Sequence, residues 1–184
     1  MTLVKSDIFR RIGKIPSVLS IYISMLIPFS DISFLFWLRF SSYKGILYPF
    51  CRFMYERTSR KKCIQISPFT KIGYGFYLGH GICIVINNKT IIGNNVNISQ
   101  FLNIGTNHNA PAVIGDNVYI GPHVSIVENV HISSNSTIGA GTVVTKNVPK
   151  NATVAGVPSR ILNFNNPARY IKFKYLSEME KSKI

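Results

Sequence analysis

An aliphatic residue recurs every six positions through the middle of the chain, and this spacing predicts its architecture. The series is Ile66, Ile72, Leu78, Ile84, Ile92, Ile98, Ile104, Ile114, Ile120, Ile126, Ile132, Ile138 and Val144. The spacing slips by two residues before Ile92, and a four-residue insertion falls within Thr106–Val113. A second apolar or small residue usually follows four positions later, as at Phe76, Val96 and Val118.

Side-chain geometry decides which element carries this repeat. On an α-helix, six residues advance by about 240° net, so the marked side chains would fall on three separate stripes. On extended chain, offsets of four and six are both even, so every marked side chain points to one side. Ten of the 13 glycines lie in Gly73–Gly141, where they suit corners between short strands. The repeat predicts a triangular β-solenoid of a little over four coils.

The segments on either side of the repeat lack this pattern and define three regions. We expect a helical, aromatic and basic region over 1–62, the solenoid over 63–162, and a loop followed by a short charged helix over 163–184. The uncharged run between Lys14 and Asp31 holds 16 residues, including Pro16 and Pro28. A membrane-spanning helix needs about 20 mostly apolar residues, so this run predicts none.

Charge is concentrated at the two ends of the chain. The net charge is +14, and residues 1–62 carry 11 basic and three acidic side chains, whereas residues 63–158 carry four and two. Aromatic and basic residues mixed in this way fit either a helical hairpin packed on the solenoid or helices lying on an anionic membrane. Nucleic-acid binding also fits the charge, but no recognised nucleic-acid motif is present. Three cysteines without a CxxC pair suit a reducing compartment.

The repeat resembles the hexapeptide-repeat acyltransferases, which fold as left-handed parallel β-helices. Within that family, several segments resemble the serine acetyltransferase branch: Ile72–Gly81 (IGYGFYLGHG), Ile98–Gln100 (ISQ), Gly139–Val144 (GAGTVV) and Val154–Arg160 (VAGVPSR). The aromatic and basic front end is more similar to that of O-acetyltransferases that modify capsule or O-antigen sugars. The resemblance implies a mainly β fold with N-terminal helices, an acetyl-CoA co-substrate and a homotrimer with sites between adjacent subunits.

Three residues are candidates for the catalytic site. His80 lies between two glycines at a corner, where its imidazole is accessible, and the resemblance implies that it is the catalytic base. The serine-specific enzymes of the family orient that histidine with an aspartate fifteen residues earlier, where this chain has Gln65. A glutamine oxygen can fix the imidazole tautomer but cannot stabilise the imidazolium by charge. His108, in the inserted loop, is a candidate acceptor contact that lies slightly earlier than the second active-site histidine of the serine-specific enzymes.

A second set of residues is expected to hold coenzyme A. Ala140 and Gly141 offer a small surface with free backbone groups, Lys146 and Arg160 match the family's basic contacts, and Gly105 is a candidate backbone donor to the carbonyl oxygen. The two remaining histidines, His123 and His131, lack the close pairing of a zinc site and are expected to be surface corner residues. We expect no metal. Cys83 is interpreted as a small core residue rather than a nucleophile.

These features predict an acetyl-CoA-dependent O-acetyltransferase acting on a sugar hydroxyl of a bacterial surface polysaccharide or its lipid-linked precursor, with His80 as general base. The alternatives are a serine O-acetyltransferase, an N-acetyltransferase of an amino sugar nucleotide, and a non-enzymatic solenoid scaffold. We expect a cytoplasmic protein. Residues 1–62 are expected either to pack on the solenoid or to contact the inner face of the cytoplasmic membrane.

Overall fold

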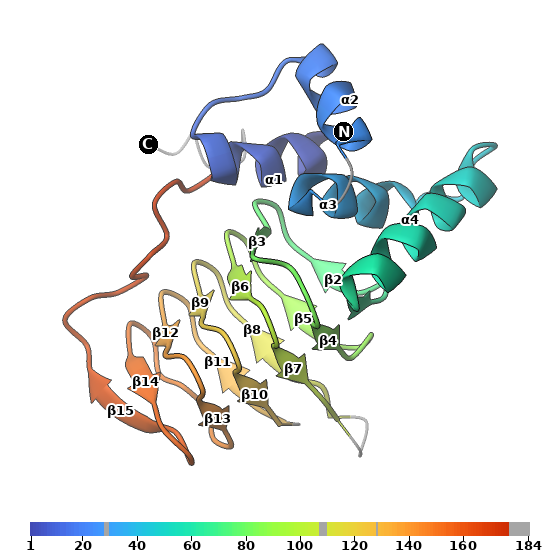
Figure 1. Ribbon diagram of the computed structural model, residues 1–184. Helices are drawn as coiled ribbons and strands as arrows, with labels where there is room; N and C mark the ends of the chain where they lie inside the picture. The colour runs from blue at the N-terminus through green and yellow to red at the C-terminus, as the bar shows by residue number, and fades with distance from the viewer. Residues whose placement is uncertain (28–29, 107–109, 128, 177–184) are drawn as a thin grey trace.

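The computed structural model describes residues 1–27, 30–106, 110–127 and 129–176. Four helices precede a column of short strands, and the helices cover one end of that column (Figure 1). The helices are α1 (Thr2–Ile12), α2 (Val18–Leu26), α3 (Asp31–Phe40) and α4 (Tyr48–Lys62). Ser17 and Ser30 cap α2 and α3 by accepting backbone N–H bonds, which explains where these two helices begin.

The strands stack into three sheets, one on each side of the solenoid, and all pairs but the last are parallel. The five-stranded sheet contains β1 (Gln65–Ile66), β4 (Val85–Ile86), β7 (Asn103–Ile104), β10 (Ser125–Ile126) and β13 (Val143–Val144). The four-stranded sheet contains β2 (Lys71–Ile72), β5 (Ile91–Ile92), β8 (Val113–Ile114) and β11 (His131–Ile132). The six-stranded sheet contains β3 (Tyr77–Gly79), β6 (Asn97–Ser99), β9 (Tyr119–Ile120), β12 (Thr137–Ile138), β14 (Thr153–Ala155) and the antiparallel β15 (Arg160–Asn163).

The predicted β-helix is confirmed, and its interior is built from the repeat. Nearly every residue of the six-residue series is buried, including Ile66, Ile98 and Ile138 at no exposure. Ile72 is only partly buried and packs at the edge of the core. Equivalent aliphatic side chains stack from coil to coil because each strand pairs in register with the strand one coil later.

The two-residue slip lies at a different corner from the one predicted. Ile66 pairs with Ile86, so Ile86, rather than Ile84, occupies the strand position of the second coil. The two extra residues therefore fall between Leu78 and Ile86, in the connection that contains His80. Both Ile84 and Ile86 are buried and apolar, and spacing alone could not separate them. The four-residue insertion lies between β7 and β8, as expected.

Helix α1 closes the open end of the solenoid with polar side chains. Ser6 Oγ accepts the backbone N–H of Gly75 at 2.8 Å, and Asp7 Oδ1 accepts that of Phe76 at 2.8 Å. Arg10 donates to the carbonyl of Gly75 at 3.0 Å and to the side chain of Asn97. Burial lowers the pKa of the Arg10 guanidinium to about 10, so it stays charged near neutral pH. These bonds satisfy backbone groups that the first coil would otherwise leave unpaired.

An ion pair between α1 and α3 reinforces the same junction. Arg39 donates to Asp7 through Nε at 2.9 Å and through Nη2 at 3.1 Å, and both residues are buried. Its remaining donors bond the carbonyls of Ile72 and Gly73 at 2.8 and 2.6 Å. A buried charge pair of this kind is tolerated only when its hydrogen bonds are satisfied.

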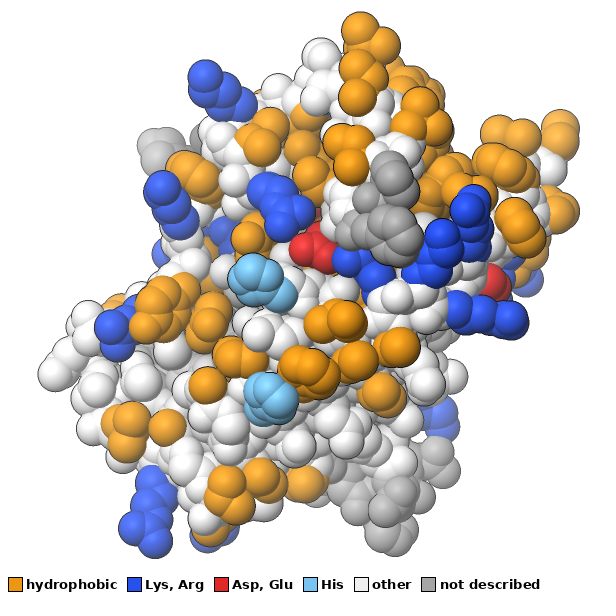
Figure 2. Space-filling model, viewed as in Figure 1, with side chains coloured by type: hydrophobic (Ala, Val, Ile, Leu, Met, Phe, Trp, Pro, Cys, Tyr) orange, Lys and Arg blue, Asp and Glu red, His pale blue; other side chains and the backbone are white. Residues whose placement is uncertain are grey.

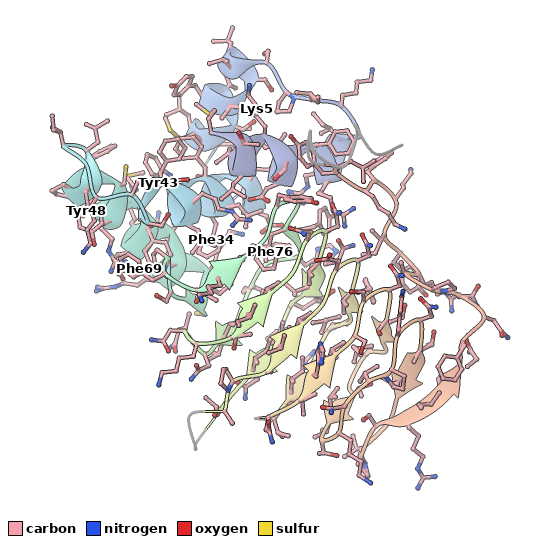
Figure 3. All side chains as sticks on the ribbon, turned by 180° about the vertical axis from the view of Figure 1, so that it is seen from behind. Lys5, Phe34, Tyr43, Tyr48, Phe69 and Phe76 are labelled. Carbon is pink, nitrogen blue, oxygen red and sulfur yellow. The ribbon has the colours of Figure 1, made fainter. Side chains whose placement is uncertain are left out.

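Apolar contacts complete the junction, and α4 joins it to the first strand. Phe34 on α3 and Phe76 on the first coil are fully buried where the helices meet the solenoid (Figure 3). On α4, Tyr55 donates to the carbonyl of Ile66 and Ser59 donates to that of Ile64. The helical region is therefore continuous with the solenoid core.

The described part of the C-terminal segment forms no helix, and most of the charged residues of the expected helix lie outside the described residues. After β15, the chain runs back along the solenoid to α1 without forming a helix as far as Leu176, and residues 177–184 lie outside the described part (Figure 1). Tyr175 exchanges two hydrogen bonds with the Asn95 side chain, at 2.8 and 3.0 Å. Phe9 packs edge-on against Phe173 and Tyr175. Aromatic contacts with α1 determine the path of this segment.

Within the described ranges, no single helix has the length and composition needed to cross a membrane. Helices α2 and α3 meet those criteria only as a pair, which is bent by 107°.

Candidate active site

His80 lies on an enlarged corner between the six-stranded and five-stranded sheets, named here the His80 corner. The register pairs Gly79 with Ser99, while the Phe101 N–H bonds the carbonyl of Ile82 one coil earlier. Between these two points the first coil has three residues, His80 to Ile82, and the second has only Gln100. The enlargement leaves His80 exposed, with a left-handed φ of 55°.

Residues of the helical region contact this corner through Gly81. Lys62 Nζ donates to the carbonyl of Gly81 at 3.3 Å and to Asp31 Oδ1 at 2.8 Å. Asp31 also pairs with Arg11 at 3.3 Å. A Cβ on Gly81 would lie 2.9 Å from Asp31 Oδ1, so only glycine fits without displacement. The sequence patterns gave no signal for this carboxylate beside the corner, because Asp31 is 49 residues from His80 in the chain.

Each later coil has a corresponding corner, and one residue at each of these corners has a left-handed backbone conformation. Cys83, Phe101, His123 and Gly141 occupy equivalent positions with φ between 51° and 67°. The Phe101 and His123 rings stack at 4.4 Å between centroids. These residues form a column below His80 along one edge of the solenoid.

Three of the predicted coenzyme residues lie at this edge. Ala140 and Gly141 are exposed in the β12–β13 connection, three coils beyond His80. At about 4.8 Å for each strand spacing, they lie roughly 14 Å along the edge from His80. Arg160 is exposed at the start of β15, where it pairs with Ala155 next to the same edge. The structure therefore places His80, Ala140, Gly141 and Arg160 along one edge.

Two other predicted residues do not show the contacts expected of them. Gln65 is exposed at the start of β1, and among the described residues no hydrogen bond joins its side chain to His80. The Gly105 N–H donates to the carbonyl of Ile126 at 3.2 Å, so the strand ladder already uses it. A backbone donor role for Gly105 in oxyanion binding does not fit this geometry.

Lys146 and the inserted loop lie at another edge, where the five-stranded sheet meets the four-stranded sheet. Lys146 is exposed after β13, and the loop joins β7 to β8. His108 falls on residues 107–109 and lies outside the described residues. Within one chain, the five-stranded sheet separates Lys146 and the loop from His80.

The two remaining histidines and Cys83 were predicted to have no role in the reaction. His123 is an exposed corner residue as expected, but His131 is the exposed first residue of β11 rather than a corner residue. Among the described residues, no group of three or more His, Cys, Asp or Glu side chains could hold a metal ion. Cys83 is half-buried, and desolvation together with the neighbouring Cys63 raises the pKa of its thiol. A protonated thiol is a poor nucleophile.

Known proteins share this repeat and this fold. Residues 111–146 match the family model described as bacterial transferase hexapeptide (six repeats). The serine acetyltransferase of Buchnera aphidicola subsp. Schizaphis graminum is 34% identical over 120 residues, which are 62% of this chain and 46% of the relative. The galactoside O-acetyltransferase of Escherichia coli (strain K12) is 36% identical over 118 residues, which are 56% of this chain and 58% of the relative. The chain thus spans about half the length of the curated relatives it matches.

A solved structure extends the similarity to most of the chain. Serine acetyltransferase from Brucella abortus strain S19, in complex with coenzyme A, aligns with a TM-score of 0.70 at 26% identity, covering 88% of this chain and 66% of that chain. The fold and the repeat are therefore those of hexapeptide-repeat acyltransferases. Within that class, the similarity supports the serine acetyltransferase type, while the expected resemblance to capsule or O-antigen enzymes is not shown.

The predicted polysaccharide acceptor is contradicted by these comparisons. The relatives and structural neighbours include serine acetyltransferases of several organisms, which corresponds to the alternative prediction. The prediction relied partly on the basic front end of the chain. The structure gives three of the 11 basic residues of that front end another role, because Arg10, Arg39 and Lys62 bond the first coil and its corner.

Proposed function

We propose that this protein is an acetyl-CoA-dependent O-acetyltransferase that uses serine as its acceptor. The main support is the position of His80, exposed on an enlarged corner at the same edge as Ala140 and Gly141. Similarity to serine acetyltransferases supports acetyl transfer to serine as the reaction at that edge. The aligned relative was solved with coenzyme A.

In the proposed reaction, His80 acts as general base. Its imidazole accepts the serine hydroxyl proton while the hydroxyl oxygen attacks the thioester carbonyl carbon. The tetrahedral species then collapses, the carbon–sulfur bond breaks, and the imidazolium returns the proton to the leaving thiolate. Acetyl transfer is direct, so no covalent enzyme intermediate forms. General-base catalysis of this kind contributes about 10²–10⁴ to the rate.

The coenzyme would lie along the His80 corner. Ala140 and Gly141 leave room for an extended arm close to the backbone, and a Cβ built on Gly141 meets nothing within 4 Å. Arg160, exposed at the far end of the edge, would meet a coenzyme phosphate. The span of roughly 14 Å between Gly141 and His80 is long enough to separate phosphates from the reacting thioester.

A homotrimer would complete the site. In one chain the five-stranded sheet separates His80 from the inserted loop and Lys146. If solenoids pack side by side, the loop edge of one copy can face the His80 corner of the next. We therefore propose that each site combines His80 of one subunit with Lys146 and the loop of its neighbour.

Coenzyme A release tests the proposed acceptor directly. The purified full chain is supplied with acetyl-CoA and, separately, L-serine, a methyl galactoside or a nucleotide amino sugar. We expect serine-dependent thiol release, with O-acetylserine identified by mass spectrometry. Thiol release with the galactoside or the amino sugar but not with serine would refute serine as the acceptor. Absence of release with every acceptor, together with no acetyl-CoA binding, would refute the enzymatic proposal itself.

A further inference from the structure

Large apolar side chains are exposed on two neighbouring parts of the helical region. On α2, the exposed set is Val18, Leu19, Tyr22, Ile23 and Leu26, followed by Ile27. On the α3–α4 connection and the start of α4, it is Tyr43, Ile46, Leu47, Phe50 and Phe53. The most protruding members are Ile46 at 100% exposure, Leu26 at 73% and Leu19 at 70%. Soluble surfaces seldom gather so many large apolar side chains, so the two sets together indicate a binding face.

Both sets lie at the helical end of the molecule, away from the last coils. Figure 1 places α2 and the beginning of α4 at that end, and Figure 2 shows hydrophobic side chains over both places with Lys and Arg side chains beside them. From behind, Tyr43 and Tyr48 lie at the same end, remote from β15 (Figure 3). We call this surface the α2–α4 face.

The net charge of this face is positive, although Glu56 also lines the hollow on it. The three acidic residues of the segment are all ion-paired: Asp7 with Arg39, Asp31 with Lys62 and Arg11, and Glu56 with Arg52. Lys14, Lys44, Arg57 and Arg60 are exposed around the apolar sets. A partner of this face must therefore offer apolar contact and negative charge together.

A groove on this face combines the same two properties. It encloses about 300 Å³ between α2, α3 and α4, with apolar walls from Met25, Leu26, Trp37, Phe50 and Met54, and with Arg57 and Lys61 at its border. An adjacent hollow of about 530 Å³ is lined by Phe53, Glu56, Arg57, Arg60 and Lys61. The apolar groove thus opens beside a mainly basic hollow.

Trp37 supplies an independent sign of a ligand. It is 3% exposed, it lines the groove, and its indole N–H has no hydrogen-bond partner in the described structure. A buried donor without an acceptor is costly, because it has lost water without gaining another bond. An ester or phosphate oxygen reaching the groove would supply that acceptor.

We propose that the α2–α4 face docks on a bilayer containing anionic phospholipid, with an acyl chain entering the groove and the lipid phosphate near Arg57 and Arg60. Tyrosine, phenylalanine and leucine beside lysine and arginine is the composition of segments that lie at membrane interfaces. A second copy of the chain is a poorer partner, because an isologous contact would place the same uncompensated cations opposite one another. This proposal does not depend on the acceptor of the acetyl group.

Vesicle sedimentation of the full chain tests the docking. We expect binding to phosphatidylcholine vesicles that contain phosphatidylglycerol, much weaker binding to pure phosphatidylcholine, and a loss of the difference at high salt. Equal binding to both vesicle types at low salt, or binding to neither, would overturn the proposal. A concentration-dependent increase in mass beyond the trimer without vesicle binding would identify a second copy as the partner instead.

Matched variants locate the surface. Leu19→Glu with Leu26→Glu, and separately Lys44→Glu with Arg60→Glu, should each lower binding to anionic vesicles by about tenfold or more. Leu162→Glu and Lys150→Glu each place one change of the same kind at an exposed position elsewhere on the solenoid, so these variants should bind like the parent protein. Circular dichroism confirms folding in each case. Unchanged vesicle binding by both α2–α4 variants would contradict this location.

Trp37 makes the groove itself observable, because it is the only tryptophan of the chain. Vesicles made with brominated acyl chains should quench its fluorescence, whereas vesicles of the same composition without bromine should not. Leu19→Glu with Leu26→Glu should abolish the quenching. Vesicle binding with unquenched Trp37 fluorescence would show docking without a chain in the groove and would overturn that part of the proposal.

Discussion

At the scale of single residues, the candidate chemistry depends on one corner that differs from its neighbours. His80 is left-handed and exposed because two additional residues enlarge its connection, while the equivalent corners below it follow the regular path. Lys62 and Asp31 then hold the enlarged corner through Gly81. The position of the imidazole is therefore set by side chains from α3 and α4 as well as by the coil.

Removing the imidazole should remove catalysis without harming the fold. His80→Ala is expected to lower kcat by about 10²–10⁴, because the hydroxyl then lacks a positioned base. The measurement is coenzyme A release under saturating substrates. His131→Ala is the matched control, since His131 is also exposed but lies on the four-stranded sheet. A wild-type rate for His80→Ala would remove His80 from the mechanism.

Gly81 offers a test of the corner's geometry. A methyl group at this position would lie 2.9 Å from Asp31 Oδ1 and 3.1 Å from Leu78 Cδ1, so the corner must shift. Gly81→Ala should lower kcat by about 10- to 100-fold with a smaller change in KM for acetyl-CoA, because a displaced base no longer meets the hydroxyl. Gly45→Ala, whose Cβ meets nothing within 4 Å, is the control. Equal kinetics for the two variants would mean that the corner tolerates the shift.

At the scale of elements, α1 acts as the cap of the solenoid. A parallel β-solenoid exposes unpaired backbone groups at each end, and Ser6, Asp7 and Arg10 bond them at the first coil. Arg39 of α3 joins the same network through Asp7. The helical region thus supplies hydrogen-bond partners to the first coil of the solenoid.

Breaking the buried Asp7–Arg39 ion pair should therefore lower the free energy of unfolding substantially. Asp7→Asn leaves the Arg39 guanidinium buried without its counter-charge and should lower the free energy of unfolding by about 3–5 kcal/mol. Glu56→Gln removes a carboxylate from an exposed pair with Arg52 and should change it by less than about 1 kcal/mol. Urea denaturation of both variants measures the difference. Similar losses for the two variants would rule out a dominant role of the Asp7–Arg39 pair.

At the scale of the whole molecule, the two edges of the five-stranded sheet carry different parts of the proposed site. His80 lies at one edge and Lys146 at the other, so a shared site requires neighbouring copies. The docking proposed for the α2–α4 face would use the helical end and leave these edges open.

Subunit complementation tests the shared site. The chain mass is 20.7 kDa, and light scattering should give three times that value. His80→Ala and Lys146→Glu should each be impaired alone, and their co-expression should restore part of the activity by combining intact halves in mixed trimers. Co-expressed variants that stay as impaired as the separate ones would place both residues in one subunit's site.

The sequence by itself was sufficient for the solenoid. Six-residue spacing places Ile66, Ile98 and Ile138 on one side of extended chain, and burial of those side chains drives the coil. The exposure of His80 was also predictable, because it lies between two glycines at a corner, whereas its role as the candidate base came from the family resemblance. The location of the slip was not, since Ile84 and Ile86 are equally apolar and only strand pairing distinguishes them.

Only the tertiary structure decided what surrounds the corner and what the front end does. Asp31, Lys62 and Gly81 meet through long-range contacts for which no local pattern exists. Composition made the first 62 residues basic and aromatic, but it did not separate the arginines that bond the first coil from those left exposed on α4. Periodicity reports local geometry, whereas burial and pairing of charges depend on which segments the fold brings together.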